Sequence, residues 1–316
     1  MNKNEKIFCA GHRGMVGSAI VRALKNDGYN NIVVKTHQEL DLTSQLAVNL
    51  FFQEYKPQYV FLAAARVGGI LANDTYRAEF IYDNLMIEAN VIHAAYKNGV
   101  KKLLALGSSC IYPRESKRPL IEEDLMSAPL EPTNEPYAIA KIAGIKLCEA
   151  YRDQYGFNAI SLMPPNLYGQ GDSYGENNTH VLPSLMRRFH QAKASWQKEA
   201  IVWGSGEPYR EFMYCDDMAD ACIFAMQNYN ERLFLNVGTG VDIQIKELAE
   251  KIKKIVGYEG EIIFDKTKPD GTMRKLLDST RINDLGWRGK INLDEGLQLA
   301  YKFFKQELNG HDRKPD

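Results

Sequence analysis

The stretch IFCAGHRGMVGSAI, residues 7–20, decides the fold. Its four leading apolar residues predict a buried strand, and the apolar residues that follow recur at helical spacing. Glycines in the pattern G-x-x-G-x-x-G join the two, and they let the backbone turn tightly and approach a pyrophosphate. The N–H groups at the start of the helix would then face the phosphates. The glycines are Gly11, Gly14 and Gly17, and the helical face is Val16, Ile20, Ala23 and Leu24.

Short apolar runs alternate with longer helical patterns as far as residue 165. A long helix is predicted at 79–97, and another begins near Pro136, where proline suits the first turn, and ends near Gly156. This order of elements predicts an α/β fold of the Rossmann type with a doubly wound parallel sheet. The further strands are predicted at 32–34, 59–64, 103–106 and 160–163.

The alternation weakens after residue 166, where loops rich in Gly, Asn, Asp and Tyr appear. We therefore expect two domains. Residues 1–165 are predicted to form a dinucleotide-binding Rossmann domain, and residues 166–316 a smaller C-terminal α/β domain that binds the substrate. Segments at about 213–240 are expected to return to the first domain.

The composition excludes several classes of protein. In 316 residues, Lys plus Arg number 39 and Asp plus Glu 40, so the net charge is −1 and gives no basic excess for a nucleic-acid backbone. No apolar run reaches the length of a membrane-spanning helix. The five cysteines are scattered without Cys-x-x-Cys spacing, which indicates neither a disulfide framework nor a metal site. We expect a cytoplasmic enzyme without nucleic-acid or membrane partners.

The residues after the second strand indicate the type of dinucleotide. NAD sites usually carry an Asp or Glu about 20 residues beyond the glycines, whereas here the strand ends in VKTHQ, residues 34–38. Lys35, His37 and Arg13 can surround a 2′-phosphate, so the predicted cofactor is NADP(H). The alternative is that Lys35 and His37 are solvated surface residues.

Tyr137 and Lys141 are four residues apart and share a helical face. An ammonium beside a phenol lowers the phenol's pKa and helps it exchange a proton with a carbonyl oxygen as hydride moves. Ser108 follows a predicted strand, at the edge where open α/β sheets bind ligands. Alone, the Tyr/Lys pair could be a pair of surface residues. A glycine-rich turn, a serine at a strand end and a Tyr/Lys pair, in this order, resemble the pattern of the extended short-chain dehydrogenase/reductases. A separate stripe is predicted to face the core: Ile139, Ile142, Ala143, Leu147 and Ala150.

Longer segments make the resemblance more specific. Over nearly its whole length the chain closely resembles the GDP-L-fucose synthase family. The resemblance implies NADPH-dependent 3,5-epimerisation and 4-keto reduction of GDP-4-keto-6-deoxy-D-mannose to GDP-L-fucose. The segments are AGHRGMVGSAI (10–20), AAARVGGI (63–70), LGSSCIYP (106–113), EPTNEPYAIAKIAGIKLCE (131–149), VWGSG (202–206), NVGTGVD (236–242) and KPDGT (268–272).

The resemblance also implies catalytic and substrate-binding roles. Ser108, Tyr137 and Lys141 would form the reductase triad, and Cys110 and His180 would be the base and acid that move protons at C3 and C5. The 4-keto group makes both carbons acidic, because Tyr137 and Ser108 can stabilise the enolate that deprotonation gives. The expected substrate contacts are Arg188, Trp203, Arg210, Asp270 and Lys275.

Cofactor contacts are expected from the glycine turn and the strand ends. The sequence departs from the family pattern where arginine is usual at His37, so the NADPH preference is expected to be weaker or pH-dependent. Pro165 replaces a usual threonine, and the loop 169–178 differs just before His180. The expected contacts are Gly11, His12, Arg13, Gly14, Met15, Val16, Gly17, Lys35, His37, Asp41, Leu42, Ala63, Ala64, Ala65, Leu106, Gly107, Ser108, Tyr137, Lys141, Pro164, Pro165, Asn166, Leu167 and His180.

The sequence leaves other activities open. The first alternative is a C4-only reductase for a related GDP-4-keto sugar, such as a 6-deoxy-heptose in surface polysaccharide biosynthesis. Another is an NAD-retaining 4-epimerase or 4,6-dehydratase, against which the missing acid after the second strand counts. A non-catalytic NADP sensor is the third. The family further implies a homodimer in which the helices at about 79–97 and 137–155 pair with their symmetry mates.

Overall fold

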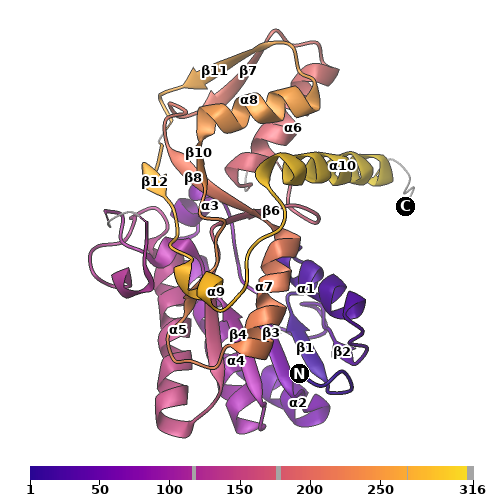
Figure 1. Ribbon diagram of the computed structural model, residues 1–316, viewed down its shortest axis with the longest axis vertical. Helices are drawn as coiled ribbons and strands as arrows, with labels where there is room; N and C mark the ends of the chain where they lie inside the picture. Colours follow the sequence, from indigo (N-terminus) through magenta and orange to yellow (C-terminus); the bar gives the residue numbers. More distant parts are fainter. Residues whose placement is uncertain (116–118, 176–178, 269, 312–316) are drawn as a thin grey trace.

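The computed structural model describes residues 1–115, 119–175, 179–268 and 270–311. Its lower part in Figure 1 is a parallel sheet with the strand order β2-β1-β3-β4-β5-β9. The order steps outward from β1 in both directions, as in a doubly wound sheet, and the predicted Rossmann-type fold is confirmed. The strands are β1 (Ile7–Ala10), β2 (Ile32–Val33), β3 (Tyr59–Leu62), β4 (Lys102–Leu106), β5 (Ala159–Met163) and β9 (Leu235–Asn236).

Helices cover both faces of this sheet, because alternate strand residues point to opposite sides. Ile7 and Cys9 of β1 pack in one core, and Phe8 and Ala10 pack in another. All four are buried, and strands covered on both sides are accordingly continuous apolar runs. The first core includes α1 (Met15–Asn26) and α7 (Cys215–Asn228), and the second includes α2 (Gln45–Tyr55), α4 (Arg77–Lys97) and α5 (Glu135–Tyr155).

Helix α5 buries a different face from the one predicted. Lys141, Gly144 and Cys148 are buried, whereas Ile139 is 42% exposed and Ala150 is also exposed. The predicted apolar stripe is therefore wrong at Ile139 and Ala150, whereas Ile142 and Leu147 are partly buried against the core. The buried face holds a charged residue because α4 supplies a carboxylate to pair with it, and because a glycine lets the two helices come close.

A second group of elements forms the upper part of Figure 1. In its larger sheet β8 pairs with β10, β12 and β6, while β7 and β11 form a separate parallel pair. Helices α6 and α8 pack together, and α10 packs on α8. The strands of this group are β6 (Asn166–Tyr168), β7 (Glu199–Trp203), β8 (Tyr209–Tyr214), β10 (Asp242–Gln244), β11 (Glu261–Asp265) and β12 (Arg274–Lys275), and its helices are α6 (Val181–Ala194), α8 (Ile245–Val256) and α10 (Leu293–His311). Three short elements pack on the large-sheet part instead: α3 (Ile70–Thr75) on α4, α9 (Thr280–Asp284) on β9 and the 3-10 turn η1 (Ser109–Ile111) on α5. A second 3-10 turn is η2 (Glu122–Asp124).

The chain passes between the two sheets at β6 and β8. Strand β6 follows β5 after only Pro164 and Pro165, and β8 runs directly into α7 at Cys215. The sheet of β8 therefore starts where β5 ends, next to the carboxyl edge of the large sheet. Within the described residues, no helix combines the length and the apolar character that crossing a membrane would need.

Candidate active site

A buried ion pair joins α4 to α5. The Lys141 ammonium donates hydrogen bonds to Glu88 Oε1 and to the Leu106 carbonyl oxygen, both at 2.8 Å. Both charged side chains are nearly inaccessible, with exposures of 4% and 5%. A Cβ at Gly144 would overlap the Glu88 carboxylate, so glycine allows this close approach. Sequence reasoning missed Glu88. The sequence does show that Glu88 lies four residues after Asn84, a spacing that places both polar side chains on one face of the predicted helix. In the structure both residues are buried.

Tyr137 lies one helical turn before Lys141 and is half-buried. Its ring packs edge-on against Phe80, with centroids 6.3 Å apart, and the Lys141 ammonium lies 5.9 Å from its centroid. Burial raises the pKa of the phenol well above its ordinary value; the nearby Cys110 and Glu88 act in the same direction, and a hydrogen bond with the Ser108 side chain opposes them.

The pKa of Tyr137 corrects a prediction made from the sequence. An ammonium neighbour was expected to lower it, but the charge of Lys141 is offset by Glu88, and burial dominates. At neutral pH Tyr137 is therefore an uncharged phenol, which can donate a proton. That protonation state suits the reduction of a carbonyl group, in which the new hydroxyl needs a proton.

Ser108 caps the short turn η1 and lies beside the buried Cys110, whose N–H donates to the serine hydroxyl at 3.4 Å. Burial raises the pKa of the Cys110 thiol, while the positive charge of Lys275, the Ser108 hydroxyl and the charge of Lys141 lower it. The structure thus brings Ser108, Cys110, Tyr137 and Lys141 together, and we call these four residues the Tyr137 cluster.

His180 lies elsewhere, at the N-cap of α6. The residue keeps access to solvent, yet the protein around the ring lowers the pKa of its imidazole, so the neutral form is favoured at pH 7. Among the described residues no hydrogen bond connects His180 to the Tyr137 cluster. Its part in proton transfer stays a prediction, and residues 176–178 of the loop before it lie outside the described chain.

The glycine turn forms as the sequence predicts. Gly11 has φ of +87°, and a Cβ there would lie 2.7 Å from the Ala64 nitrogen. A Cβ at Gly17 would overlap the carbonyl oxygen of Gly11. Gly14 is the N-cap of α1, and within the described residues no side chain caps that end and no acid occupies its first turn. The open N–H groups and the close packing fit a pyrophosphate.

Other expected cofactor contacts follow the carboxyl ends of the large sheet. Ala63 donates from its N–H to the Ala10 carbonyl at 3.1 Å, and Gly107 donates to Leu162 at 2.9 Å. Ser109 donates to the Pro164 carbonyl at 3.1 Å. These bonds hold neighbouring strand ends side by side, so the segments 63–65, 106–108 and 164–167 follow one edge of the sheet together with the glycine turn.

The turn after β2 contains an acid, Glu39, that was not among the residues predicted to bind NADP(H). Glu39 folds back so that its carboxylate accepts the Thr36 N–H at 2.8 Å, and these Thr36 bonds, with the charges of Lys35 and Arg13, lower its pKa. Lys35 also lies 4.9 Å from the Tyr55 ring centroid. Lys35 and Arg13 thus each act on the Glu39 carboxylate, and their joint contact with a 2′-phosphate stays a prediction.

His37, Asp41 and Leu42 follow on the same segment. The His37 side chain is 81% exposed and lies 3.9 Å from Asp41 Oδ1, an oxygen that accepts the Thr43 N–H and hydroxyl at 2.9 and 2.7 Å. The Leu42 carbonyl accepts the amide of Asn90 from α4 at 3.0 Å. Among the described residues no hydrogen bond or ion pair joins His37 to Arg13, so the contact of His37 with a 2′-phosphate stays a prediction.

Two cations flank the half-exposed indole of Trp203. The Arg188 guanidinium lies 5.7 Å and the Lys268 ammonium 5.3 Å from the ring. Arg188 also donates to the Ile201 carbonyl, and burial lowers its pKa. The structure therefore unites Arg188 with Trp203, as the sequence predicts, and adds Lys268.

Arg210, Asp270 and Lys275 meet at β8 and β12. Arg210 donates to the Asp270 carbonyl at 3.3 Å, and Lys275 stands opposite Arg210 in the parallel pairing of the two strands. The Asp270 carboxylate accepts the N–H and the hydroxyl of Ser205, each at 2.7 Å. Since Lys275 acts on Cys110 as well, this strand pair connects the expected substrate contacts to the Tyr137 cluster.

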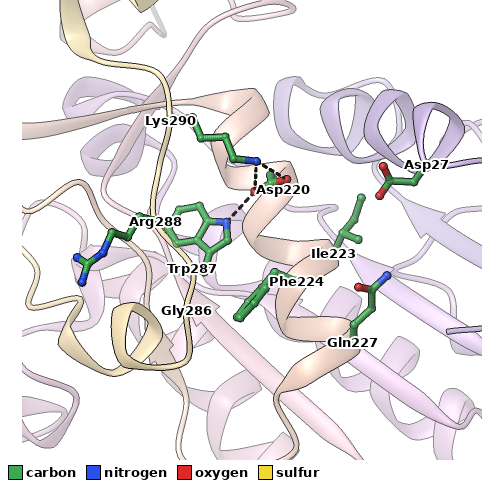
Figure 2. A pocket seen from close by; sticks show the side chains of 9 residues that line it. All are labelled: Asp27, Asp220, Ile223, Phe224, Gln227, Gly286, Trp287, Arg288 and Lys290. Carbon is green, nitrogen blue, oxygen red and sulfur yellow. Dashed lines mark hydrogen bonds and ion pairs between the residues drawn. The ribbon is translucent and has the colours of Figure 1, made fainter.

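A pocket of about 310 Å³ lies on another side of the molecule, between α7, the end of α1 and residues 286–290. Figure 2 shows Trp287 and Lys290 both turned toward Asp220, with the indole N–H donating at 2.8 Å. Among the described residues that line this pocket, none was predicted to belong to the active site.

These features define a dinucleotide-dependent enzyme with a Ser/Tyr/Lys cluster at the edge of a Rossmann-type sheet. The model of the NAD dependent epimerase/dehydratase family matches residues 7–238, and the chain belongs to that family.

Individual relatives narrow the comparison. The chain is 54% identical over 318 residues to a GDP-L-fucose synthase of Escherichia coli (98% of each chain) and 57% identical over 307 residues to GDP-L-fucose synthase 1 of Arabidopsis thaliana (97% of this chain, 95% of that one). A solved GDP-mannoheptose C4 reductase from Campylobacter jejuni with NADP bound is 44% identical, with a TM-score of 0.89 over 96% of this chain and 99% of that one.

Proposed function

We propose that the protein is an NADP-dependent enzyme that epimerises C3 and C5 of GDP-4-keto-6-deoxy-D-mannose and reduces C4, giving GDP-L-fucose. The observation that carries the proposal is a buried thiol, Cys110, beside the Ser108–Tyr137 pair. The positive charge of Lys275 lowers the pKa of this thiol. Relatives 54% and 57% identical over almost the whole chain are GDP-L-fucose synthases, which supports the same substrate.

The cluster can perform both kinds of step on one bound sugar. Cys110 removes a proton next to the carbonyl, assisted by Lys275, while Ser108 and Tyr137 donate hydrogen bonds to the enolate oxygen. The protonated form of His180, which is the minor form at pH 7, returns a proton to the carbon from its own side and becomes neutral. Tyr137 then gives its proton to the C4 oxygen, and Lys141, held by Glu88 and Leu106, keeps the helix face in place.

The cofactor would lie along the carboxyl edge of the sheet in residues 1–165. The N–H groups around Gly14 would hold the pyrophosphate, and Arg13 with Lys35 the 2′-phosphate. When bound, NADPH supplies the hydride for C4. In residues 166–316, Arg188, Trp203 and Arg210 would bind the GDP moiety, since guanidinium groups suit diphosphates and an indole can stack on a base.

Glu39→Gln is expected to tighten NADPH binding by about threefold, because it removes a negative charge near the 2′-phosphate at an exposed site. The gain should shrink as salt is added. Titration of NADPH fluorescence at two ionic strengths measures it, with the exposed Glu250→Gln as control. Unchanged or weaker NADPH binding by Glu39→Gln would place the 2′-phosphate elsewhere.

Cys110→Ser is expected to slow deuterium exchange at C3 and C5 by about 100-fold, because a hydroxyl is far less acidic than a thiol and supplies almost none of the anion that acts as the base. Reduction of the already epimerised keto sugar should change only a few-fold. Cys148→Ser, at a buried cysteine of α5 outside the cluster, is the matched control. Equal losses of exchange and reduction would show that Cys110 is structural.

A second candidate follows from the resemblance to the Campylobacter C4 reductase: reduction of a related GDP-4-keto-heptose without epimerisation. Assaying NADPH oxidation and product structure with both GDP-4-keto sugars separates the two. Turnover of the heptose substrate alone, without inversion at C3 and C5, would favour the second candidate.

We also propose a homodimer formed by α4 and α5. Tyr82 is 60% and Ile139 is 42% exposed on these helices, which leaves apolar surface for a second copy. Sedimentation of the purified protein tests this. All five cysteines are buried and unpaired, which fits a reducing compartment and the proposed cytoplasmic location.

A further inference from the structure

Glu211 is a fully buried carboxylate on β8 that the mechanism above does not use. Its Oε1 accepts the N–H groups of Thr239 and Gly240 at 2.6 and 2.8 Å, and its Oε2 accepts the Leu277 N–H at 2.9 Å. The Thr239 hydroxyl adds a bond at 3.2 Å. A Cβ at Gly238 would overlap the carboxylate, so that loop is shaped around Glu211.

The bond to Leu277 continues the attachment of β12 to β8. Tyr209 donates to the Met273 carbonyl at 2.8 Å, and β12 pairs with β8 only as far as Lys275 opposite Arg210. Beyond that pair the chain turns toward Leu120, whose N–H donates to Leu276 at 2.8 Å. The Glu211 side chain therefore holds the segment where the regular pairing stops, just after Lys275.

This segment brings Lys275 to the Tyr137 cluster. Leu277 packs in a small core with Ile111, the residue after Cys110. The charged and titratable groups that act on the Cys110 thiol are Lys275 and Lys141, and the thiol in turn acts on Tyr137. Of the two ammonium groups, Lys275 lowers the pKa of the thiol more than Lys141, which also pairs with Glu88.

We propose that Glu211 is a positioning residue for epimerisation: by binding the segment after Lys275, it keeps that ammonium beside Cys110. The inference rests on the proposed function, in which Cys110 is the base. Four donors surround the carboxylate, so an amide there would point its NH₂ group at other N–H groups and release part of the segment.

The test compares Glu211→Gln with Asp217→Asn. Asp217 is also buried and its carboxylate also accepts two backbone N–H groups, from Lys290 and Ile291, but on a segment away from Lys275. For Glu211→Gln we expect the pH midpoint of deuterium exchange at C3 and C5 to rise by about one unit. Exchange at pH 7 should fall about tenfold relative to reduction of the epimerised sugar. Asp217→Asn should change neither ratio nor midpoint.

A second measurement of the same pH shift needs no substrate. Alkylation of Cys110 by iodoacetamide, followed on its peptide by mass spectrometry, should show the same alkaline shift in Glu211→Gln. If wild type exchanges no deuterium, the proposed function fails, while the alkylation still tests the placement of Lys275. Should Glu211→Gln not fold, Gly238→Ala pushes the carboxylate from the other side and should give a smaller shift. Wild-type midpoints in the folded variant would overturn the proposal.

Discussion

Tyr137→Phe should lower the rate of C4 reduction by at least about 100-fold, because the phenol of Tyr137 is the group proposed to give the C4 oxygen its proton. The missing hydroxyl also removes a hydrogen bond with Ser108. The ring, its contact with Phe80 and the Lys141–Glu88 pair remain, so NADPH affinity and melting temperature should stay close to wild type.

Single-turnover oxidation of NADPH measures this loss directly. Tyr258→Phe is the matched control, since Tyr258 is buried in the second part of the molecule and its ring stacks on Phe189. That variant should reduce the substrate at the wild-type rate. Residual reduction by Tyr137→Phe within tenfold of wild type would assign the proton to another donor.

Gly17→Ala should raise the dissociation constant of NADPH by more than about tenfold and lower the melting temperature, because overpacking a tight site costs about 1–3 kcal/mol. The added Cβ would overlap the carbonyl oxygen of Gly11, which belongs to the backbone and cannot rotate away. The turn must then open, and the N–H groups that face the pyrophosphate move with it.

Gly14→Ala tests the same turn without the clash. Gly14 has φ of −75°, and the nearest atom to its Cβ, the Gly11 oxygen, lies at 3.4 Å. Its melting temperature should therefore match wild type, whatever happens to cofactor binding. A Gly17→Ala protein with wild-type melting and NADPH affinity would contradict the geometry of the turn.

The large sheet could be predicted from the sequence because its signals are local. Buried parallel strands are continuous apolar runs, and the Gly11–Gly17 turn marks the first crossover. The helix ends at Pro136 and Gly156 were visible for the same reason. The short strands β6, β10 and β12 were not visible, since two or three residues carry no period and their pairing depends on distant partners.

The site was predictable in part. The spacing of Tyr137 and Lys141 is local, but Glu88 lies 53 residues before its lysine, and only folding shows that it cancels the charge of Lys141. The pKa of Tyr137 was misjudged for that reason. Glu39 was passed over because the turn after β2 folds it back toward Arg13. Glu211 carries no motif, and its role depends on three separated segments meeting at one carboxylate.

In the proposed function, one site both epimerises and reduces the sugar. The most direct measurement is turnover of GDP-4-keto-6-deoxy-D-mannose with NADPH in deuterium oxide, with the product examined by NMR and mass spectrometry. We expect GDP-L-fucose that carries deuterium at C3 and C5, with NADPH oxidised in equal amount. A reduced product without deuterium at either carbon and with both centres uninverted would contradict it.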